Sequence, residues 1–193
     1  MKKLLSVLLA LVLVLSAFTL VSCNEKDGDS KKGEETSNDT QTAPDAPTSA
    51  TNQTLTILGY DFYVSKGLAE TAFTEMELKH MSVYVDSATG AKLTVSGTVE
   101  PGITDEEIKE MYPQDAEAAK AATAVSYMYT YSDYVYETAS YGIKFSYKVD
   151  KGMDEITYNT AYYFIEGETI IIFAFEEKDA ARPCGESFAV LDA

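Results

Sequence analysis

The sequence predicts a single α+β domain with an antiparallel sheet of about five to seven strands and flanking helices, preceded by a signal peptide and a disordered tether. Three observations support this fold class. An apolar run near the start closes at Cys23, and a polar stretch follows it. From Leu55 onward, several short segments alternate apolar with polar residues, which is the period of half-buried strands. A helix-start signal at Thr104 lies among these segments, so strands and helices share one chain.

Residues 1–22 have the features of a secretory signal. Two lysines precede an apolar run over 4–20, which ends in Leu20-Val21-Ser22-Cys23. The run is close to the roughly 17-residue minimum for a spanning helix, so an uncleaved anchor is the alternative interpretation. The segment resembles the signals of bacterial lipoproteins, in which an aliphatic residue stands three positions before a cysteine and a small residue stands directly before it. This resemblance implies a diacylglyceryl thioether on Cys23, cleavage before it, and attachment to the extracytoplasmic face of a bacterial membrane.

The chain therefore divides into a signal peptide (1–22), a lipidated and disordered polar tether (23–53) and the α+β domain (54–193). The stretch after Cys23 has almost no apolar residue larger than alanine, so it cannot bury enough surface to offset the entropy of ordering. A random coil of about 30 residues spans roughly 30 Å. We expect the domain to stand clear of the membrane.

The charge of the chain is strongly acidic. Its 193 residues carry 15 Lys and Arg against 31 Asp and Glu, a net charge of -16. Loss of the signal removes two lysines and no acid, which makes the mature charge -18. Such a charge disfavours nucleic acid, because binding there depends on neutralising phosphates. It also disfavours lying flat on anionic lipid, whereas an acidic surface keeps an exported protein soluble.

Residues that hold metals or act as nucleophiles are scarce. The two cysteines are Cys23 and Cys184, and lipidation of the first leaves the second without an intramolecular partner. Cys184 is then either a reactive thiol or a small buried apolar residue. His80 is the one histidine, and no Cys or His stands near it in a zinc-binding spacing. The sequence predicts neither a metal nor a cofactor.

The first elements of the domain are strands. Tyr60–Val64 alternates in the strand period. Two further segments, 81–85 and 92–99, are separated by turn-forming residues at 86–90, which predicts a hairpin. Thr104 and Glu107 then form a capping box, so a short helix should begin at Asp105. Pro113 interrupts this helix, and the alanine-rich segment 115–124 predicts a second one.

The next segment is ambiguous. Tyr127, Tyr129 and Tyr131 alternate as in a strand, but Tyr127, Tyr131 and Tyr134 also fit one face of a helix. We favour a strand. The three segments 142–149, 156–165 and 169–175 then follow one another with turns between them, which predicts three antiparallel strands.

The segment 169–175 is apolar on both faces, so it should be central and covered by a helix on at least one side. The C-terminal residues from Pro183, including Phe188, are candidates for part of that cover. This order of elements resembles the PsbP-like family of extracytoplasmic proteins, with short pieces such as 164–170 in common. The resemblance implies an antiparallel sheet flanked by helices and an assembly or binding role. It transfers no catalytic residues.

Tyrosine is the most unusual component of the domain, with fourteen in the chain. Tyrosine combines a rigid apolar ring with a polar tip, so an exposed row of rings binds proteins, peptides or sugars at low entropic cost. Alternatively, the rings cover a sheet face and only their hydroxyls reach water. The candidate binding residues are Tyr127, Tyr129, Tyr131, Tyr134 and Tyr136.

Acidic residues gather at 75–77, 105–110 and 176–179, without the spacing of a known catalytic or metal site. We interpret the second group as complementing a helix dipole and the third as a solvated strand end. The sequence thus favours a membrane-anchored, non-enzymatic binding or assembly module for a protein or cell-envelope ligand. The alternative is an enzyme that uses carboxylates. An enzyme would need two convergent carboxylates in a pocket, or His80 beside an acid.

Overall fold

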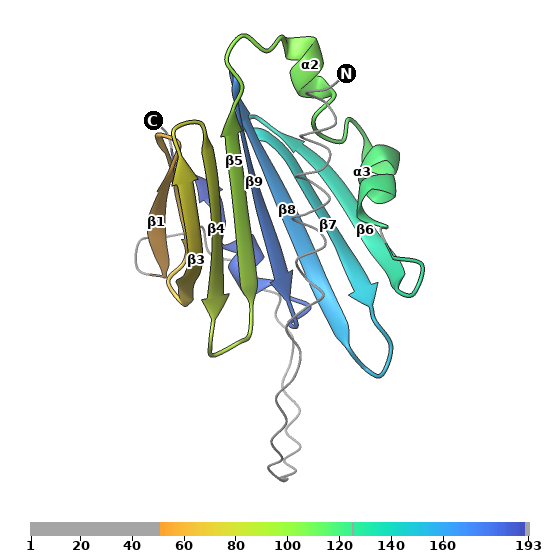
Figure 1. Ribbon diagram of the computed structural model, residues 1–193. Coiled ribbons are helices and arrows are strands. Elements are labelled where there is room, and N and C mark those ends of the chain that lie inside the picture. Colours follow the sequence, from red (N-terminus) through yellow and green to blue (C-terminus); the bar gives the residue numbers. More distant parts are fainter. Residues whose placement is uncertain (1–50, 125, 192–193) are drawn as a thin grey trace.

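The computed structural model describes residues 51–124 and 126–191, and within them it contains two antiparallel sheets and three short helices (Figure 1). The larger sheet has seven strands in the order β3-β4-β5-β9-β8-β7-β6, and the smaller has the order β1-β2-β10. The fold class predicted from the sequence is confirmed. The elements are β1 (Asn52–Ile57), β2 (Tyr60–Ser65), β3 (Leu68–Met76), β4 (Lys79–Asp86), β5 (Lys92–Val99), α2 (Asp105–Lys109), α3 (Ala116–Thr123), β6 (Thr130–Ala139), β7 (Gly142–Asp150), β8 (Ile156–Glu166), β9 (Thr169–Glu177), α4 (Pro183–Glu186) and β10 (Ala189–Val190).

The predicted hairpin and the predicted three-strand meander both form. β4 and β5 pair from Lys79↔Thr98 to Val85↔Lys92. The meander strands β7, β8 and β9 pair in sequence order, and β9 then joins β5. This last pairing places β9 fourth of the seven strands, which agrees with its apolar residues on both faces.

The main core lies on one face of β9, around Phe173 and Phe175. The small sheet covers this face, and Phe62 of β2 contacts Phe173 with ring centroids 4.6 Å apart. The C-terminal segment adds Phe188, whose ring lies 4.8 Å from Phe173. The predicted contribution of the C-terminal segment is confirmed. The predicted helix on at least one side of β9 is present as α4, which covers part of this face, and the second sheet provides the rest of the cover.

A smaller core lies on the opposite face of the large sheet, over β6 and β7. Ala119 of α3 packs there with Phe145, Tyr147 and Val149. Figure 1 shows α3 beside β6. Both predicted helices form, and the capping box at Thr104 is complete. The two faces of the large sheet are therefore buried at different ends, one by the small sheet and one by α3.

Two strands differ from the sequence-based expectation. β3 was not predicted, because it is an edge strand whose residues after Leu68 are all exposed and so lack an apolar period. β1 begins at Asn52, two positions before the expected start of the domain. The side-chain amide of Asn52 donates to the Ser187 carbonyl at 2.8 Å. The rest of the predicted signal and tether lies outside the described residues. In the part of the chain that the structure describes, no helix has the length and apolarity needed to cross a membrane.

Candidate functional site

The five candidate tyrosines lie at one edge of the large sheet, in β6 and in the turn that leads into it. We call Tyr127, Tyr129, Tyr131, Tyr134 and Tyr136 the tyrosine surface. The last four are half-buried and pack against the smaller core, whereas Tyr127 is fully exposed. β6 begins at Thr130, so the favoured strand is present from there, but the residues before it form a turn rather than a strand.

A β-bulge explains the ambiguous spacing of these tyrosines. The register of β6 on β7 shifts between Ser132 and Val135, and Asp133 takes the left-handed conformation with φ 54°. The extra residues of the bulge change which side chains of β6 point to each face of the sheet. Tyr131 and Tyr136 lie opposite Val149 and Phe145 on the face that α3 covers, and Tyr134 joins them there.

Aromatic contacts hold the rings of the tyrosine surface in place. Tyr134 stacks on Phe145 at 5.8 Å and on Tyr147 at 6.1 Å between ring centroids. Lys120 of α3 lies over the Tyr134 ring with its Nζ 5.5 Å from the centroid. The hydroxyl of Tyr136 donates to the Pro113 carbonyl at 3.2 Å. These contacts restrict ring rotamers before any ligand arrives.

Two hydroxyls of this surface, those of Tyr134 and Tyr136, have raised pKa values and stay neutral at physiological pH. Burial raises the pKa of Tyr134, and a hydrogen bond to Thr123 opposes that shift. Burial also raises the pKa of Tyr136, with a further contribution from the Asp115 carboxylate. Neutral phenols donate and accept hydrogen bonds but supply no base. Tyr134 and Tyr136 are therefore suited to hydrogen bonding rather than to proton transfer.

The turn before β6 carries the most exposed apolar side chains near this surface. Tyr127 is 100% and Met128 is 76% exposed. The Met128 amide donates to the Ser126 hydroxyl at 3.2 Å, which fixes the turn. Side chains this exposed bury little apolar area on folding, so they contribute little to the free energy of unfolding.

His80 lies beside an acid, the arrangement that an enzyme would require. His80 Nε2 makes a 2.8 Å hydrogen bond with Ser82 Oγ, and His80 Nδ1 lies 4.0 Å from Glu75 Oε1. The order acid, histidine, serine is that of a hydrolase triad. However, Ser82 is only 2% exposed and faces the core, so its hydroxyl cannot reach a substrate. Burial lowers the pKa of His80, and the carboxylates of Glu75 and Glu70 oppose that shift.

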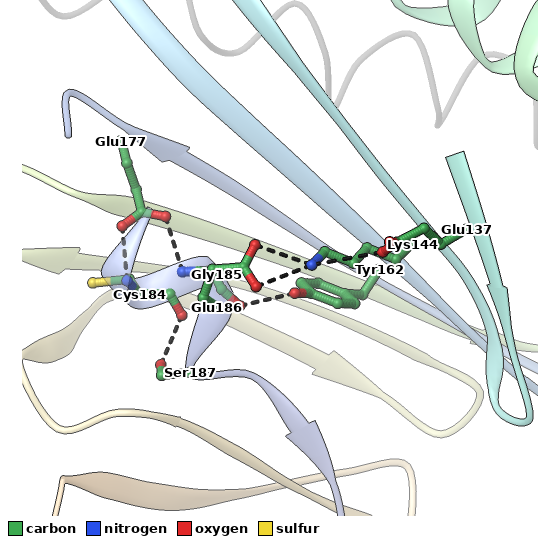
Figure 2. Close-up of polar contacts among 8 residues, drawn as sticks. All are labelled: Glu137, Lys144, Tyr162, Glu177, Cys184, Gly185, Glu186 and Ser187. Carbon is green, nitrogen blue, oxygen red and sulfur yellow. Dashed lines mark hydrogen bonds and ion pairs between the residues drawn. The ribbon is translucent and has the colours of Figure 1, made fainter. Parts of the chain in front are cut away.

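A second polar cluster surrounds α4 (Figure 2). Glu177 is buried, and its two carboxylate oxygens accept hydrogen bonds from the Cys184 and Gly185 amides at 2.8 and 2.9 Å. The hydroxyl of Tyr162 donates to the Gly185 carbonyl at 3.0 Å. The expectation that the end of β9 is solvated was therefore wrong at Glu177. Folding of the C-terminal segment over β9 covers this carboxylate, and burial raises its pKa.

The same segment is tied to β7 through Lys144. Its ammonium donates to both carboxylate oxygens of Glu186 at 3.0 Å and lies 3.7 Å from Glu137 (Figure 2). We call residues 183–190 the C-terminal clasp. Its polar groups bond to one another and to the sheet, so the cluster stabilises the fold and holds no group poised for reaction. Cys184 is buried within it, and burial raises the pKa of its thiol to about 11.

The acidic groups singled out from the sequence do not converge. Glu75 and Glu77 are exposed at the β3–β4 hairpin, and the acids at 105–107 sit in the first turn of α2. Among residues 51–124 and 126–191, no group of three His, Cys, Asp or Glu side chains is arranged to hold a metal ion. Cys23, the predicted lipidation site, lies outside the described residues.

No known family model and no curated protein matches this chain. Among solved structures, the chain is similar to the solution structure of cyanobacterial PsbP (CyanoP) from Synechocystis sp. PCC 6803. The sequence identity is 14%, the match covers 78% of this chain and 99% of that one, and the TM-score is 0.49. That protein belongs to the group that the order of elements resembles. A likeness at this level does not place the chain in the family and carries no functional conclusion.

Sequence reasoning missed the buried carboxylate of Glu177 and the pairing of His80 with Glu75. The second depends on β3, which was not predicted, because Glu75 lies opposite His80 across the β3–β4 pair. The first had no local signal, because the residues that bond to Glu177 are Cys184 and Gly185 of α4, which follow it only after a turn.

Proposed function

We propose that this protein is a non-enzymatic binding module, anchored through lipidated Cys23 at the extracytoplasmic face of a bacterial membrane, and that its tyrosine surface binds a protein partner. One observation carries the binding proposal. Tyr127 and Met128 are exposed next to four tyrosine rings that are already fixed by packing.

The physical basis is the low cost of ordering. Each rotamer-rich side chain immobilised at an interface costs about 0.5–1.5 kcal/mol. Tyr131, Tyr134 and Tyr136 are already packed against the core, so most of this cost has been met during folding. Tyr and Met are also enriched at the centres of protein interfaces, where they fill pockets on the partner.

Anchoring rests on the sequence. The lipoprotein-type signal ending at Cys23 and the polar residues after it would leave the domain facing away from the membrane. Two acyl chains at about 0.8 kcal/mol per buried methylene hold a protein stably, whereas a single chain binds only marginally. Mass spectrometry of the membrane fraction tests this part. An unmodified Cys23, or a chain that still begins with Met1, would contradict it.

Photo-crosslinking in the producing bacterium tests the binding part. A photoreactive amino acid replaces Tyr127 in one variant and Met153 in another, since both positions are fully exposed but Met153 lies in the β7–β8 turn, outside the tyrosine surface. We expect a discrete protein adduct at position 127 and none of the same mass at 153. Adducts to glycan alone would support the cell-envelope alternative, and identical adducts at both positions would exclude a specific surface.

A further inference from the structure

The edge of the large sheet opposite the tyrosine surface is open. β3 pairs with β4 on one side, and no other strand of the described residues pairs with its second side. Every residue from Ala69 to Met76 is exposed. The backbone along such an edge presents N–H and C=O groups that can pair with an added strand.

β3 has only part of the protection that is usual for edge strands. Proteins place charged side chains, especially Lys, or Pro on an edge, shorten it, or distort it with a bulge. β3 carries Glu70 and Glu75, but it has nine residues and contains neither Lys nor Pro. Its one irregularity lies between Glu70 and Ala72, and from Ala72 to Met76 it pairs residue by residue with β4. The regular half of the strand is therefore suited to pairing.

The opposite edge is built differently. β6 is interrupted by the bulge at Asp133, and α3 packs against the face beside it. A bulge and an overlying helix both hinder the addition of a further strand. Both edges of the sheet thus carry an irregularity, but only the β6 edge is also covered by a helix.

Apolar side chains gather at the regular end of β3 and the hairpin that follows. Phe73 is 52%, Met76 is 61%, Leu78 is 40% and Met81 is 52% exposed. The four lie within nine positions of the chain, on β3, β4 and the turn between them. By the strand register, Phe73 lies on the same face of the sheet as Ser82, whereas Met76 and Met81 lie on the other face. Exposed apolar side chains therefore flank this end of the edge on both faces, which is typical of an interaction site.

The charge at this edge selects the partner. Glu70 and Glu75 lie on β3 and Glu77 follows it, whereas Lys79 is the one basic residue of the hairpin. Phe73 and Glu75 lie on one face of β3, and both contact His80. The ring centroids of Phe73 and His80 are 5.4 Å apart, and Glu75 Oε1 lies 4.0 Å from His80 Nδ1. A strand laid along β3 would place its side chains within cross-strand reach of both.

We propose that β3 accepts an extended, basic segment of another protein by strand addition. Phe73 and Glu75 are two positions apart, so the segment should carry an apolar side chain beside Phe73 and a basic side chain beside Glu75, also two positions apart. A second copy of this chain fits poorly, because its β3 edge and the chain as a whole are acidic; antiparallel pairing centred between Ala72 and Phe73, for example, sets Glu70 against Glu75 of the copy. This site is separate from the tyrosine surface and does not depend on it.

Peptide binding tests the proposal. The probe is a labelled, capped peptide of sequence Thr-Val-Thr-Lys-Thr-Val-Thr-Lys-Thr, and its control carries Glu in place of both Lys. Binding to the full chain in mild detergent is followed by fluorescence anisotropy. We expect the basic peptide to bind at least about tenfold tighter than the acidic one. Amide hydrogen exchange at residues 72–76 should slow when the basic peptide is bound.

Two variants separate strand addition from general attraction to an acidic protein. Glu75→Lys should weaken binding of the basic peptide about fivefold or more, whereas Glu166→Lys, an equal charge change at the exposed end of β8, should leave it within about twofold. Phe73→Lys replaces Glu75→Lys if the latter lowers the melting temperature. Equal weakening by the Glu75 and Glu166 variants, protection of a strand other than β3, or absence of binding would overturn the proposal. A concentration-dependent dimer that protects β3 without peptide would also overturn it, in favour of a second copy.

Discussion

At the scale of single residues, Glu177 is a buried carboxylate on which the folded structure depends. Its carboxylate is the acceptor for two buried amides at the start of α4. An unsatisfied buried donor costs about 1–3 kcal/mol. Glu177→Ala should therefore lower the free energy of unfolding by about 2–4 kcal/mol. Denaturant titration measures it, with Glu166→Ala as the exposed control; a loss equal to that of the control would contradict the bonding described above.

His80 should make stability depend on pH. Its folded-state pKa is lowered from 6.5 by burial, so the folded protein binds fewer protons than the unfolded chain just below that pH. Stability is then full above about pH 6.5 and falls as the pH drops through the lowered pKa. His80→Gln keeps a hydrogen-bonding group beside Ser82 without titrating. We expect a flatter stability profile between about pH 7.5 and 5 for this variant, and parallel profiles would exclude His80 as the source.

At the scale of elements, the C-terminal clasp closes the main core. The ring of Phe188 stacks on Tyr162 at 4.3 Å and contacts Phe173 at 4.8 Å. Truncation of a buried Phe to Ala costs about 3–5 kcal/mol, so Phe188→Ala should lower the free energy of unfolding by that amount. Met153→Ala removes a fully exposed side chain and serves as control. Urea titrations that give the same midpoint for the two variants would show that the clasp is not part of the cooperative unit.

The bulge in β6 is a second element that a substitution tests. Asp133 has φ 54°, a conformation that glycine adopts freely and β-branched residues avoid. Asp133→Val should destabilise the domain by about 1–2 kcal/mol, whereas Asp133→Gly should leave it near the wild-type value. Thermal unfolding of both variants measures this contrast. Equal melting temperatures would mean that the bulge is not fixed by this residue.

At the scale of the whole molecule, the local parts of the fold were predictable and the non-local parts were not. The capping box at Thr104 and the meander over 142–175 depend on neighbours in the sequence, so their patterns suffice. The pairing of β2 with β10 joins Phe62 to Val190, and no local pattern reports such a contact. β3 escaped prediction because an exposed edge strand needs no apolar period.

The candidate site was predictable in composition but not in geometry. The density of tyrosines at 127–136 is plain in the sequence. Which rings pack inward depends on the left-handed Asp133 and on the docking of α3, and neither follows from tyrosine spacing. The large sheet then has two edges of different character, an aromatic edge at β6 that α3 covers and an acidic edge at β3 with no strand of the described residues on its outer side.

We propose that Tyr127 and Met128 serve binding rather than folding, and measuring binding and stability on the same variants distinguishes these two roles. Tyr127 and Met128 are replaced together by Ser, and Met153→Ser is the control. Retention of the crosslinked partner on immobilised protein and the melting temperature are measured on the same samples. We predict at least about tenfold weaker retention for the double variant, a fall of about 1.4 kcal/mol or more in binding, with a melting temperature within about 2 °C of the control. Unchanged retention, or loss of retention together with a clear fall in melting temperature, would contradict a binding role for Tyr127 and Met128.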